Sequence, residues 1–463
     1  MMTMPFVVRG LFGLAVLLSA ENHVQGAGQA PASKPLQITI SKGVCAKIPL
    51  ALVGFEYLGS PEEGSIKQVI ENDLGQCGAF SLLPQQPFAL ASMGNMLDLD
   101  LTPWRSYRDA MVVSGEIRRQ GHLLTAELRM YDTTLNRCIK TGSITRKASE
   151  WREMAHHISN AIYKELSGED GVFDTQIVFI AETSNVKQKN PRLAIIDQDG
   201  ANGRLLTQDP GSYSVPRCSF VSRDIVYGIS HRYQTKLHVQ TPGGAKRVIP
   251  TQGLGVSGTF SPNGQEILFT DTLANSTLLK IHNLSSGLMR CLPVRCEGIA
   301  VSPSYSPDGK SFVIASDTPL KSQSSPTSPV RPGPPKLYQV SSDGRHITLL
   351  TPGPGSYYCP TWSPDGQHIA FVKRSKGYYY LGVMDAQGHN ERMLISDHVI
   401  DTPSWAPNSR FLVFASQQRR FGPFKIYIVD LAGRTCRSLP VKCDGKPLNG
   451  NMPYWRNNPS QAS

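Results

Sequence analysis

Two adjacent histidines, His156 and His157, are the residues whose types point most directly to metal or acid–base chemistry. They fall in a stretch with helical spacing, where adjacent side chains point about 100° apart, so the two imidazoles cannot share one metal ion. We expect one of them to be half-buried and the other exposed. Asp197 and Asp199 before Gly200 resemble the start of a calcium loop, but the later ligands are missing, which favours an ordinary turn between strands.

No enzyme signature accompanies these residues. The chain contains no G-x-S-x-G, no H-E-x-x-H, no G-x-x-x-x-G-K-[ST], and no G-x-G-x-x-G at a strand–helix turn. None of the nine cysteines forms a C-x-x-C pair, so zinc binding has little support. We therefore predict a non-enzymatic protein with no cofactor, no bound metal and no catalytic residue.

Length and charge limit the remaining classes. The 463 residues are enough for two or three domains with cores of their own. The formal net charge is +11, but lysine and arginine are scattered and no run exceeds two, as at Arg118-Arg119. Nucleic-acid binders concentrate such charge on one face or helix, so we expect no nucleic-acid partner.

The N-terminus has the form of an export signal. Arg9 precedes the short apolar run Gly10–Ala20, which has the length of a secretory h-region and is too short to span a membrane. We expect residues 1–30 to be a cleaved signal peptide and a flexible tail. No other segment approaches a transmembrane span, so we expect the mature chain to have none.

An internal repeat fills the second half of the chain. Its clearest copy reads Pro360-Thr361-Trp362-Ser363-Pro364-Asp365-Gly366 and is followed by an apolar run from Ile369. We call the residue at the Trp362 position of each copy its anchor. The anchors are Cys218, Phe260, Tyr305, Trp362, Trp405 and Trp455. A strand is expected to start seven residues after each of the first five, as at Ile225 after Cys218.

Each copy predicts one four-stranded blade of a WD40-like β-propeller, because Ser-Pro-Asp-Gly is turn chemistry and the period is roughly 40–50 residues. In the Trp362 copy the strands after the anchor strand are expected at Ile369–Val372, Tyr379–Met384 and Arg392–Ile395. The first unit, from Ile177, lacks an anchor strand, whereas Trp455 has no strands after it. We therefore predict six blades, with the C-terminal strand completing the first, and anchors that pack between blades.

Residues 36–170 have a different pattern and predict a small α/β domain. Leu36–Ser41 and Leu124–Met130 alternate like strands. Ser60-Pro61-Glu62-Glu63 has the form of a capping box that opens a helix ending near Gly75. Apolar residues from Trp151 to Leu166 follow helical spacing, and Gly168 marks their end. The predicted domains are 31–172 for the α/β domain, 173–458 for the propeller and 459–463 for a C-terminal tail.

Two features of the repeat region do not fit this plan. Leu320–Pro335 is rich in serine and proline, cannot form a core and predicts a mobile loop. Leu292–Gly298 matches Leu439–Gly445 closely, and a second cysteine, Cys291 or Cys436, precedes each copy. Either a disulfide ties this loop in both copies, or duplicated blades keep inert thiols, and both interpretations stay open.

A signal peptide, a small α/β domain and six such blades, in this order, resemble the TolB family of Tol–Pal systems. The matching segments are Ala155-His156-His157-Ile158, Ile162–Gly168, Gly171-Val172-Phe173, Asp73–Phe80, Trp104-Arg105, Asp109–Gly115 and Leu128–Asp132. Ser-Pro-Asp-Gly repeats alone are shared by many propellers, so the α/β domain makes the resemblance specific.

The resemblance implies a function and two partners. TolB-like proteins are periplasmic; they bind the outer-membrane lipoprotein Pal on one face of the propeller and TolA through their N-terminal segment. The resemblance therefore implies a periplasmic scaffold that docks a Pal-like lipoprotein and a TolA-like inner-membrane protein, supporting outer-membrane integrity and cell division. The TolA-type segment corresponds to Leu36, Ile38 and Ile40.

The topology predicts where the propeller binds its partner. The loops that enter the anchor strands open at one end of the channel. The candidate contacts there are Leu254, Val256, Val301, Tyr357, Tyr358, Ile400, Asp401 and Asn449. Several are apolar although loops should be exposed, which is expected where a partner covers them; alternatively they fold inward and plug the channel. In the first case Tyr357→Ala or Val256→Asp should weaken binding and leave folding intact.

Two other functions stay open. Tyr357, Tyr358 and Tyr378–Tyr380 could stack on sugar rings, so an exported glycan- or peptidoglycan-binding propeller is one alternative. An exported hydrolase or lyase that uses the propeller channel is the other, and no catalytic constellation supports it.

Overall fold

The computed structural model contains two compact units. One lies within Lys42–Asp174, and the other comprises Thr175 onward together with N-terminal residues up to Ser41. The described residues are 37–38, 47–55, 65–84, 99–182, 191–208, 211–231, 234–273, 276–322, 331–419, 422–433 and 435–457. The predicted signal peptide lies outside them.

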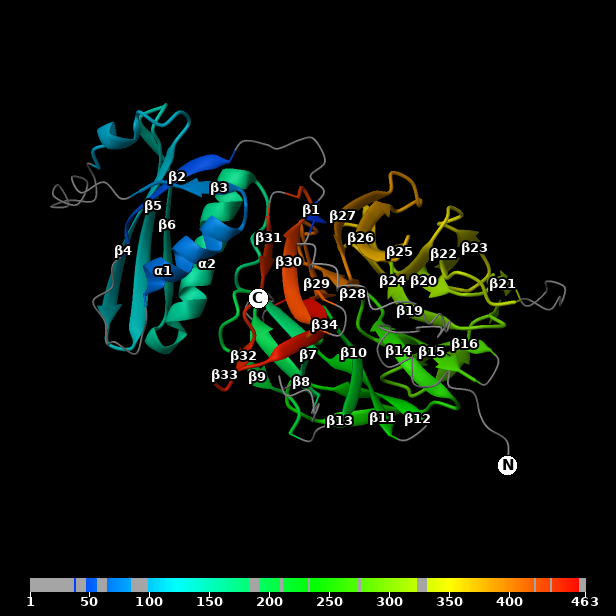
Figure 1. Cartoon of the computed structure of the whole chain (residues 1–463). Coiled ribbons are helices and arrows are strands. Elements are labelled where there is room, and N and C mark those ends of the chain that lie inside the picture. Colours follow the sequence, from blue (N-terminus) through cyan, green and yellow to red (C-terminus); the bar gives the residue numbers. More distant parts are fainter. Residues whose placement is uncertain are drawn as a thin grey trace, which may run out of the picture. The chain divides into compact units, whose positions relative to one another are not determined.

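A five-stranded mixed sheet and two helices form the first unit (Figure 1). The sheet order is β3 (Phe80–Leu82), β2 (Ile48–Gly54), β4 (Met111–Gln120), β5 (Leu123–Asp132) and β6 (Arg137–Lys147). β2 is parallel to β3 and β4, because helix α1 (Ile66–Gln76) returns the chain between β2 and β3. In β5, Leu124 and Leu128 are buried and their neighbours are more exposed, so the predicted alternation is confirmed.

Helix α1 begins later than the sequence predicts. Ser65 has an extended backbone, and its Oγ accepts a hydrogen bond from the Gln68 N–H at 3.1 Å, which makes it the N-cap. The prediction that a helix runs unbroken from Ser60 is therefore wrong, and Ser60 lies outside the described residues. Ser65 caps the helix because the apolar face of the helix, with Ile66 and Ile70 buried, starts only after this residue.

Helix α2 (Trp151–Ser167) confirms the predicted span and its end. Met154, Ile158 and Ile162 are buried along one side, as the helical spacing requires. Gly168 adopts a left-handed φ of 77° and donates its N–H to the carbonyl of Lys164, which ends the helix.

Six sheets in the described residues form the blades of a propeller (Figure 1); each has four blade strands, and β1 (Gln37–Ile38) adds a fifth strand to one of them. From the innermost strand outward, blades 1 to 3 are β34 (Asn449–Arg456), β7 (Gln176–Glu182), β8 (Arg192–Asp197), β9 (Arg204–Leu205); β10 (Ser212–Cys218), β11 (Ile225–His231), β12 (Gln234–Gln240), β13 (Lys246–Ile249); and β14 (Leu254–Phe260), β15 (Glu266–Thr272), β16 (Thr277–Asn283), β17 (Met289–Cys291).

Blades 4 to 6 have the same construction. They are β19 (Ala300–Tyr305), β20 (Ser311–Ser316), β22 (Lys336–Ser341), β23 (Ile347–Leu349); β24 (Ser356–Trp362), β25 (His368–Ser375), β26 (Tyr378–Asp385), β27 (Arg392–Asp397); and β28 (Val399–Trp405), β29 (Phe411–Gln417), β30 (Lys425–Asp430), β31 (Cys436–Ser438). Each innermost strand contacts the next, and β34 contacts both β28 and β10, so these strands close a ring around a central channel.

The anchors set the register of every blade. Each anchor is the residue that pairs with the start of the second strand, as predicted: the pairs are Cys218–Ile225, Phe260–Ile267, Tyr305–Phe312, Trp362–Ile369 and Trp405–Leu412. Trp455 of β34 pairs with Ile177 of β7 in the same way. The prediction that the C-terminal strand completes the first blade is therefore confirmed.

A β-bulge interrupts every innermost strand at its middle. In five of the six, the bulge is a residue with positive φ followed by proline: Val215, Ser302, Cys359, Thr402 and Met452. Proline lacks an N–H, which is tolerated here because one edge of an innermost strand faces the channel and has no strand to bond to. Because the register shifts at the bulge, the side chains before it and after it no longer alternate as in a regular strand.

The turns after the first five anchors are held by their own side chains. Ser363 Oγ accepts the His368 N–H at 2.9 Å and donates to Asp365 Oδ1, while Gly366 takes a φ of 74°. Anchor side chains then join neighbouring blades: the Trp405 Nε1–H donates to the carbonyl of Thr361 at 3.0 Å. The prediction that anchors pack between blades is confirmed at this pair.

Two remaining expectations about the propeller are corrected. Leu320, placed in a coreless loop, is buried in an apolar cluster, and β21 (Lys321–Ser322) pairs with β18 (Val294–Arg295); residues 323–330 lie outside the described part. All eight cysteines in the described residues are free thiols, so the disulfide interpretation of the two loops at Cys296 and Cys443 is not supported.

Candidate partner-binding rim of the propeller

The mouth of the channel at which the innermost strands begin is the candidate partner-binding site, and we call it the N-rim. It is formed by the first residues of β10, β14, β19, β24, β28 and β34 and by the loops that enter them. Of the predicted contact residues, all except Val256 have described side chains: Leu254, Val301, Tyr357, Tyr358, Ile400, Asp401 and Asn449. Each lies in an innermost strand, so the structure gathers these residues around one mouth.

The expectation that these residues stand in exposed loops is wrong. Val301, Tyr357, Ile400 and Asp401 are buried, with Tyr357 only 1% exposed, whereas Leu254, Tyr358 and Asn449 are half-buried. The physical reason is that the six strands begin before the bulge, where side chains pack against the neighbouring blade. Val301 and Tyr357 share one apolar cluster, and Leu254 packs against it.

Tyr357 stabilises the part of the rim at the start of β24. Its hydroxyl donates to the Glu391 carboxylate at 3.1 Å, and the Lys373 ammonium lies 2.7 Å from the same carboxylate and 4.8 Å from the tyrosine ring. Lys336 approaches the ring to 5.4 Å and donates to the carbonyl of Gly355. Burial raises the pKa of Tyr357. These contacts fix the loop that enters β24 from two sides.

Carboxylates at the ends of the second strands of blades 3 and 4 hold two more rim loops. Asp271 accepts backbone N–H groups from Gln252 and Gly253, at 3.0 and 2.7 Å, and its charge is paired with Lys280 at 2.7 Å. Asp317 accepts the Ile299 N–H at 2.7 Å, and burial raises its pKa. These residues were not predicted from the sequence; an acid at the end of the second strand of these two blades is the signal that could have identified them.

Asp401 is a carboxyl group buried in the channel wall. Its Oδ1 accepts the Thr402 N–H at 2.8 Å and the Cys359 thiol at 3.4 Å, whereas Oδ2 is buried without a hydrogen-bond partner. Burial raises the pKa of this carboxyl to about 6, against the opposing effect of the hydrogen bonds and of Arg217. A buried carboxyl group with one unpaired oxygen lowers the stability of the fold. It also places a titratable group beside the rim.

The predicted N-terminal segment reaches the propeller. β1 (Gln37–Ile38) adds antiparallel to the outer edge of β27, with Gln37 opposite Ser396 and Ile38 opposite Ile395. The side chain of Ile38, and Leu36 and Ile40 altogether, lie outside the described residues. The backbone of β1 therefore behaves as a strand that completes an open sheet edge.

The two chemical candidates of the sequence have structural roles. His156 is buried, and its Nδ1 lies 2.8 Å from Asp73, which joins α2 to α1; the expectation that one histidine of the pair is half-buried and the other exposed is wrong. The half-buried partner, His157, lies 3.5 Å from Glu153. Asp197 closes an ordinary turn, because its carbonyl accepts the Gly200 N–H, which confirms the prediction for that segment.

Comparison with known proteins agrees with this architecture. The model of the TolB beta propeller domain matches residues 163–455, and that of the TolB amino-terminal domain matches residues 36–138. TolB from Acinetobacter baumannii is similar at a TM-score of 0.75, with 22% sequence identity over 91% of this chain and 100% of that chain. The structure of a putative TolB from Agrobacterium tumefaciens is similar at a TM-score of 0.43, with 17% sequence identity over 62% of this chain and 99% of that chain.

The chain joins a small α/β domain to a six-bladed propeller that is closed by its last strand. This combination defines the class of two-domain propeller proteins to which the chain belongs. The chain belongs to the TolB family, whose proteins are of the Tol–Pal type. In the part of the chain that the structure describes, no helix combines the length and the apolar character needed to cross a membrane.

Proposed function

We propose that this protein is a non-enzymatic scaffold that docks a Pal-like lipoprotein on the N-rim and a TolA-like inner-membrane protein through its N-terminal segment, supporting outer-membrane integrity and cell division. The observation that carries the proposal is the construction of the rim. Its loops are held by the buried carboxylate of Asp271 and the half-buried one of Asp317, and half-buried side chains such as Leu254 and Tyr358 remain at the mouth. A preorganised rim loses little conformational entropy when a partner binds.

Gly253 and Gly255, on either side of Leu254, let the chain pack closely against the rest of the propeller. A Cβ on Gly253 would lie 2.2 Å from the carbonyl oxygen of Thr272, and one on Gly255 would lie 2.8 Å from the Thr251 methyl group. These close contacts hold this part of the rim in place, which supports a surface that is formed before a partner binds.

The N-terminal segment supports the second partner. β1 already pairs as an edge strand, which is the mode by which an extended segment adds to a partner's sheet. Removing residues up to Ser41 should abolish binding of a TolA-like domain and leave binding to the Pal-like lipoprotein intact. Loss of both would indicate that the deletion disturbs the propeller, and retention of both would refute the role of this segment.

Isothermal titration with the soluble domain of the organism's own Pal-like lipoprotein tests the rim. Leu254→Asp and Asn449→Ala should weaken binding by about 1–3 kcal/mol each, because both side chains stand at the mouth. Leu349→Asp, on the exposed outer strand β23, is the matched control and should leave the affinity unchanged. Wild-type affinity in folded rim variants would exclude the N-rim as the site.

The alternative of a glycan-binding propeller has less support. Tyr357 is buried, and only Tyr378 of the remaining tyrosines is well exposed, so the described structure offers no continuous stacking platform built from them. Sedimentation with purified peptidoglycan sacculi is the test: binding that survives Leu254→Asp and is lost in Tyr378→Ala would favour this alternative.

A further inference from the structure

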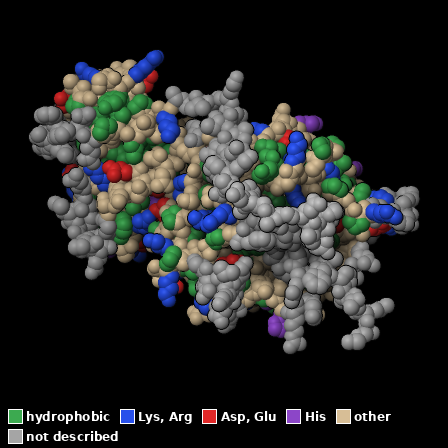
Figure 2. Space-filling model, viewed as in Figure 1, with side chains coloured by type: hydrophobic (Ala, Val, Ile, Leu, Met, Phe, Trp, Pro, Cys, Tyr) green, Lys and Arg blue, Asp and Glu red, His purple; other side chains and the backbone are tan. Residues whose placement is uncertain are grey.

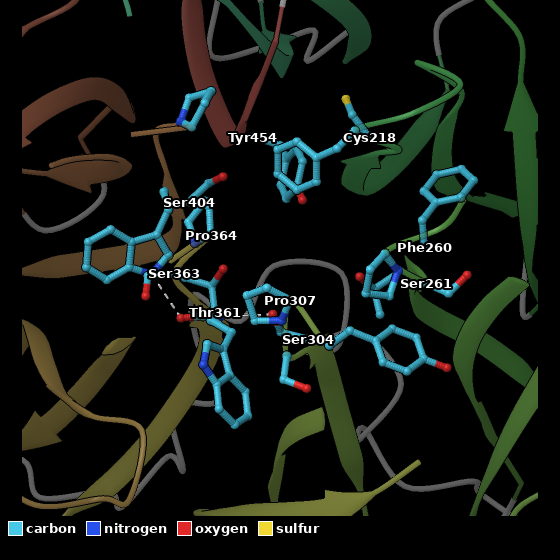
Figure 3. Close-up of a pocket in the computed structure, with 18 of the residues that line it drawn as sticks. Cys218, Phe260, Ser261, Ser304, Pro307, Thr361, Ser363, Pro364, Ser404 and Tyr454 are labelled. Atoms are coloured by element: carbon cyan, nitrogen blue, oxygen red, sulfur yellow. Dashed lines mark hydrogen bonds between the residues drawn. The ribbon is translucent and has the colours of Figure 1, made fainter. Parts of the chain in front are cut away.

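A cavity of about 320 Å³ lies at the end of the channel where the innermost strands finish. In Figure 3, Tyr454 and Cys218 stand on one side of its open centre, and Ser304 and Pro307 stand on the other. The described residues that line it supply aromatic rings, prolines, hydroxyl groups, one thiol and one amide, and none of them is charged. The cavity wall therefore has no charged group that selects an anion or a cation.

Concentrated positive charge lies instead on β6, in the first unit. The 11 residues of this strand include four basic side chains and no acidic one; the basic residues are Arg137, Lys140, Arg146 and Lys147. In the view of Figure 2, lysine and arginine side chains are dispersed over the described surface. β6 therefore gathers basic residues in a chain that otherwise scatters them.

Only weak ion pairs offset this charge. Lys140 lies 3.4 Å from Glu165, and Lys147 lies 3.9 Å from Glu150; solvent reaches all four side chains, so both pairs are screened. The Arg146 guanidinium donates to the carbonyl of Thr145 at 3.0 Å. A net positive charge therefore remains along the strand.

β6 is also a long, open sheet edge. Among the described residues it pairs only with β5, and eight of its residues are exposed. The outer strands of five blades have only two to four residues each, and the six-residue β27 is covered by β1. Folded proteins ordinarily keep open edges short, because such an edge pairs with other chains. An edge of 11 residues without proline is therefore suited to the addition of a further strand.

Every second residue of β6 turns its backbone groups outward. The Ala148 N–H donates to the His122 carbonyl at 2.8 Å, just beyond the pair of Lys147 with Leu123. Hydrogen-bonded and non-hydrogen-bonded pairs alternate along antiparallel strands, so the N–H and C=O groups of Lys147 point away from β5. The residues that face outward in this way are Thr141, Ser143, Thr145 and Lys147.

The two faces of β6 differ in chemistry. Arg137, Lys140 and Arg146 lie on the face that α2 contacts, as the ion pair of Lys140 with Glu165 requires. The hydroxyl side chains of the outward residues lie on the other face. A strand that paired with β6 would therefore set alternate side chains beside basic groups and the others beside hydroxyl groups.

A second copy of the chain does not fit this edge. Pairing of two β6 strands would bring the four basic residues of one copy against the four of the other, and β6 contains no acid to offset them. Like charges across a strand pair are destabilising, and charged residues on an edge discourage self-pairing for this reason. The same charge attracts a strand with acidic side chains.

We propose that β6 binds an extended, acidic segment of another protein, which adds to the edge of the sheet as a further strand. Main-chain hydrogen bonds to the outward residues supply affinity, and alternate aspartate or glutamate side chains beside Arg137, Lys140 and Arg146 supply selectivity. This partner is additional to the two of the proposed function. Its edge is separate from the N-rim and from β1, so the proposal stands or fails independently of them.

Hydrogen exchange of the full chain, measured by mass spectrometry, tests the proposal with designed peptides. The first probe is a capped peptide of alternating glutamate and threonine, about nine residues long, which pairs along most of β6. It should slow exchange in the segment Thr141–Lys147 by roughly tenfold or more at saturation. Two matched peptides should give no such protection: one has lysine in place of every glutamate, and one carries N-methyl groups on adjacent central backbone nitrogens.

Variants separate strand pairing from charge. Ser143→Pro removes an outward N–H that does not bond to β5, so the fold accepts it and the protection should be lost; Ser143→Ala is its control and should respond like the wild type. Lys140→Gln combined with Arg146→Gln should weaken binding by roughly tenfold. Lys310→Gln, in an exposed turn of the propeller, is the matched charge control and should leave binding unchanged. Thermal melting confirms that the variants fold.

Four outcomes would overturn the proposal. Protection that survives Ser143→Pro, or that the N-methylated peptide also gives, would show that no strand is added. Equal protection by the glutamate and lysine peptides would exclude selection by charge, and no protection by the glutamate peptide would exclude the site. Protection of the same segment that rises with protein concentration in the absence of peptide would assign the edge to a second copy.

Discussion

The thiol of Cys359 and the carboxylate of Asp401 meet at 3.4 Å across two neighbouring innermost strands, inside the channel wall. Cys359 is itself a bulge residue with positive φ, so the irregularity of β24 brings its sulfur to the acid on β28. Two groups that ordinarily ionise are thus held in contact where water has little access, and burial raises the pKa of both.

Asp401 should make the propeller less stable as pH rises. Its pKa is about 6 in the folded chain against an ordinary 3.8, so the folded state keeps a proton that the unfolded chain releases. Between about pH 4 and 6 this contribution therefore falls by up to about 1.4 kcal/mol per pH unit. Asp401→Asn should abolish that slope and raise the melting temperature near pH 7, measured by calorimetry at several pH values.

The control for this prediction is Asp308→Asn. Asp308 lies in an exposed turn, and a hydrogen bond from Ser306 lowers its pKa, so the sign of its small effect is opposite. Asn263 fills the equivalent turn position in another blade, so the fold accepts the change. An unaltered pH profile in Asp401→Asn would show that this carboxyl is not the group responsible.

Tyr357 should be a stability residue. Tyr357→Ala removes a fully buried ring from the cluster that contains Val301, so we expect a loss of about 2–4 kcal/mol in the free energy of unfolding. Tyr357→Phe keeps the ring and loses only the hydrogen bond to Glu391, for which about 0.5–1.5 kcal/mol is expected. Equal melting temperatures for wild type and Tyr357→Ala would contradict this role.

The ion pair under the loop before β14 should be expensive to break. Lys280→Met leaves the fully buried Asp271 carboxylate without its counter-ion, and we expect a loss of about 3–5 kcal/mol. Adding Asp271→Asn should restore part of it. Lys310→Met, in an exposed pair at 3.9 Å, should change stability by less than about 1 kcal/mol. A small effect of Lys280→Met, by urea unfolding, would show that water reaches the site.

Closure of the ring should control the stability of the whole propeller. The Trp455 indole donates to Thr175 Oγ1 at 2.7 Å and is almost fully buried, so Trp455→Ala should lose about 3–5 kcal/mol. Deleting Pro453–Ser463 should prevent cooperative melting of all six blades. Leu288→Ala, at an exposed turn, is the control and should change stability by about 0.5 kcal/mol or less. An unchanged melting temperature in the deletion variant would refute closure by β34.

Local chemistry made the propeller predictable from the sequence. In the Tyr305 and Trp362 copies, the serine and aspartate of the turn make in the structure the hydrogen bonds that the repeat indicated, so the strand after Trp362 starts where it was expected. The closing strand followed from counting, because Trp455 lacked partners and Ile177 lacked an anchor strand. α2 was equally clear, since its apolar spacing and Gly168 agree.

The details of the rim were not predictable, because they depend on contacts between blades. Nothing next to Tyr357 in the sequence announces Glu391, and the bulge that buries Asp401 is a property of the strand's place in the ring. Leu320 was assigned to a loop because the residues that follow it are polar, although its side chain is buried in an apolar cluster of the core.

Blade 1 is assembled from both ends of the propeller sequence, and this dictates the order in which the protein can be finished. During synthesis β7, β8 and β9 emerge first, yet the inner edge of β7 stays open until Asn449–Arg456 has followed five further blades. Contacts over such a separation form slowly, because the entropy of closing a very long loop must be overcome before they contribute. The first blade to leave the ribosome is consequently the last to be completed. A chain whose synthesis is interrupted exposes the unpaired edge of β7, which can pair with other chains and aggregate.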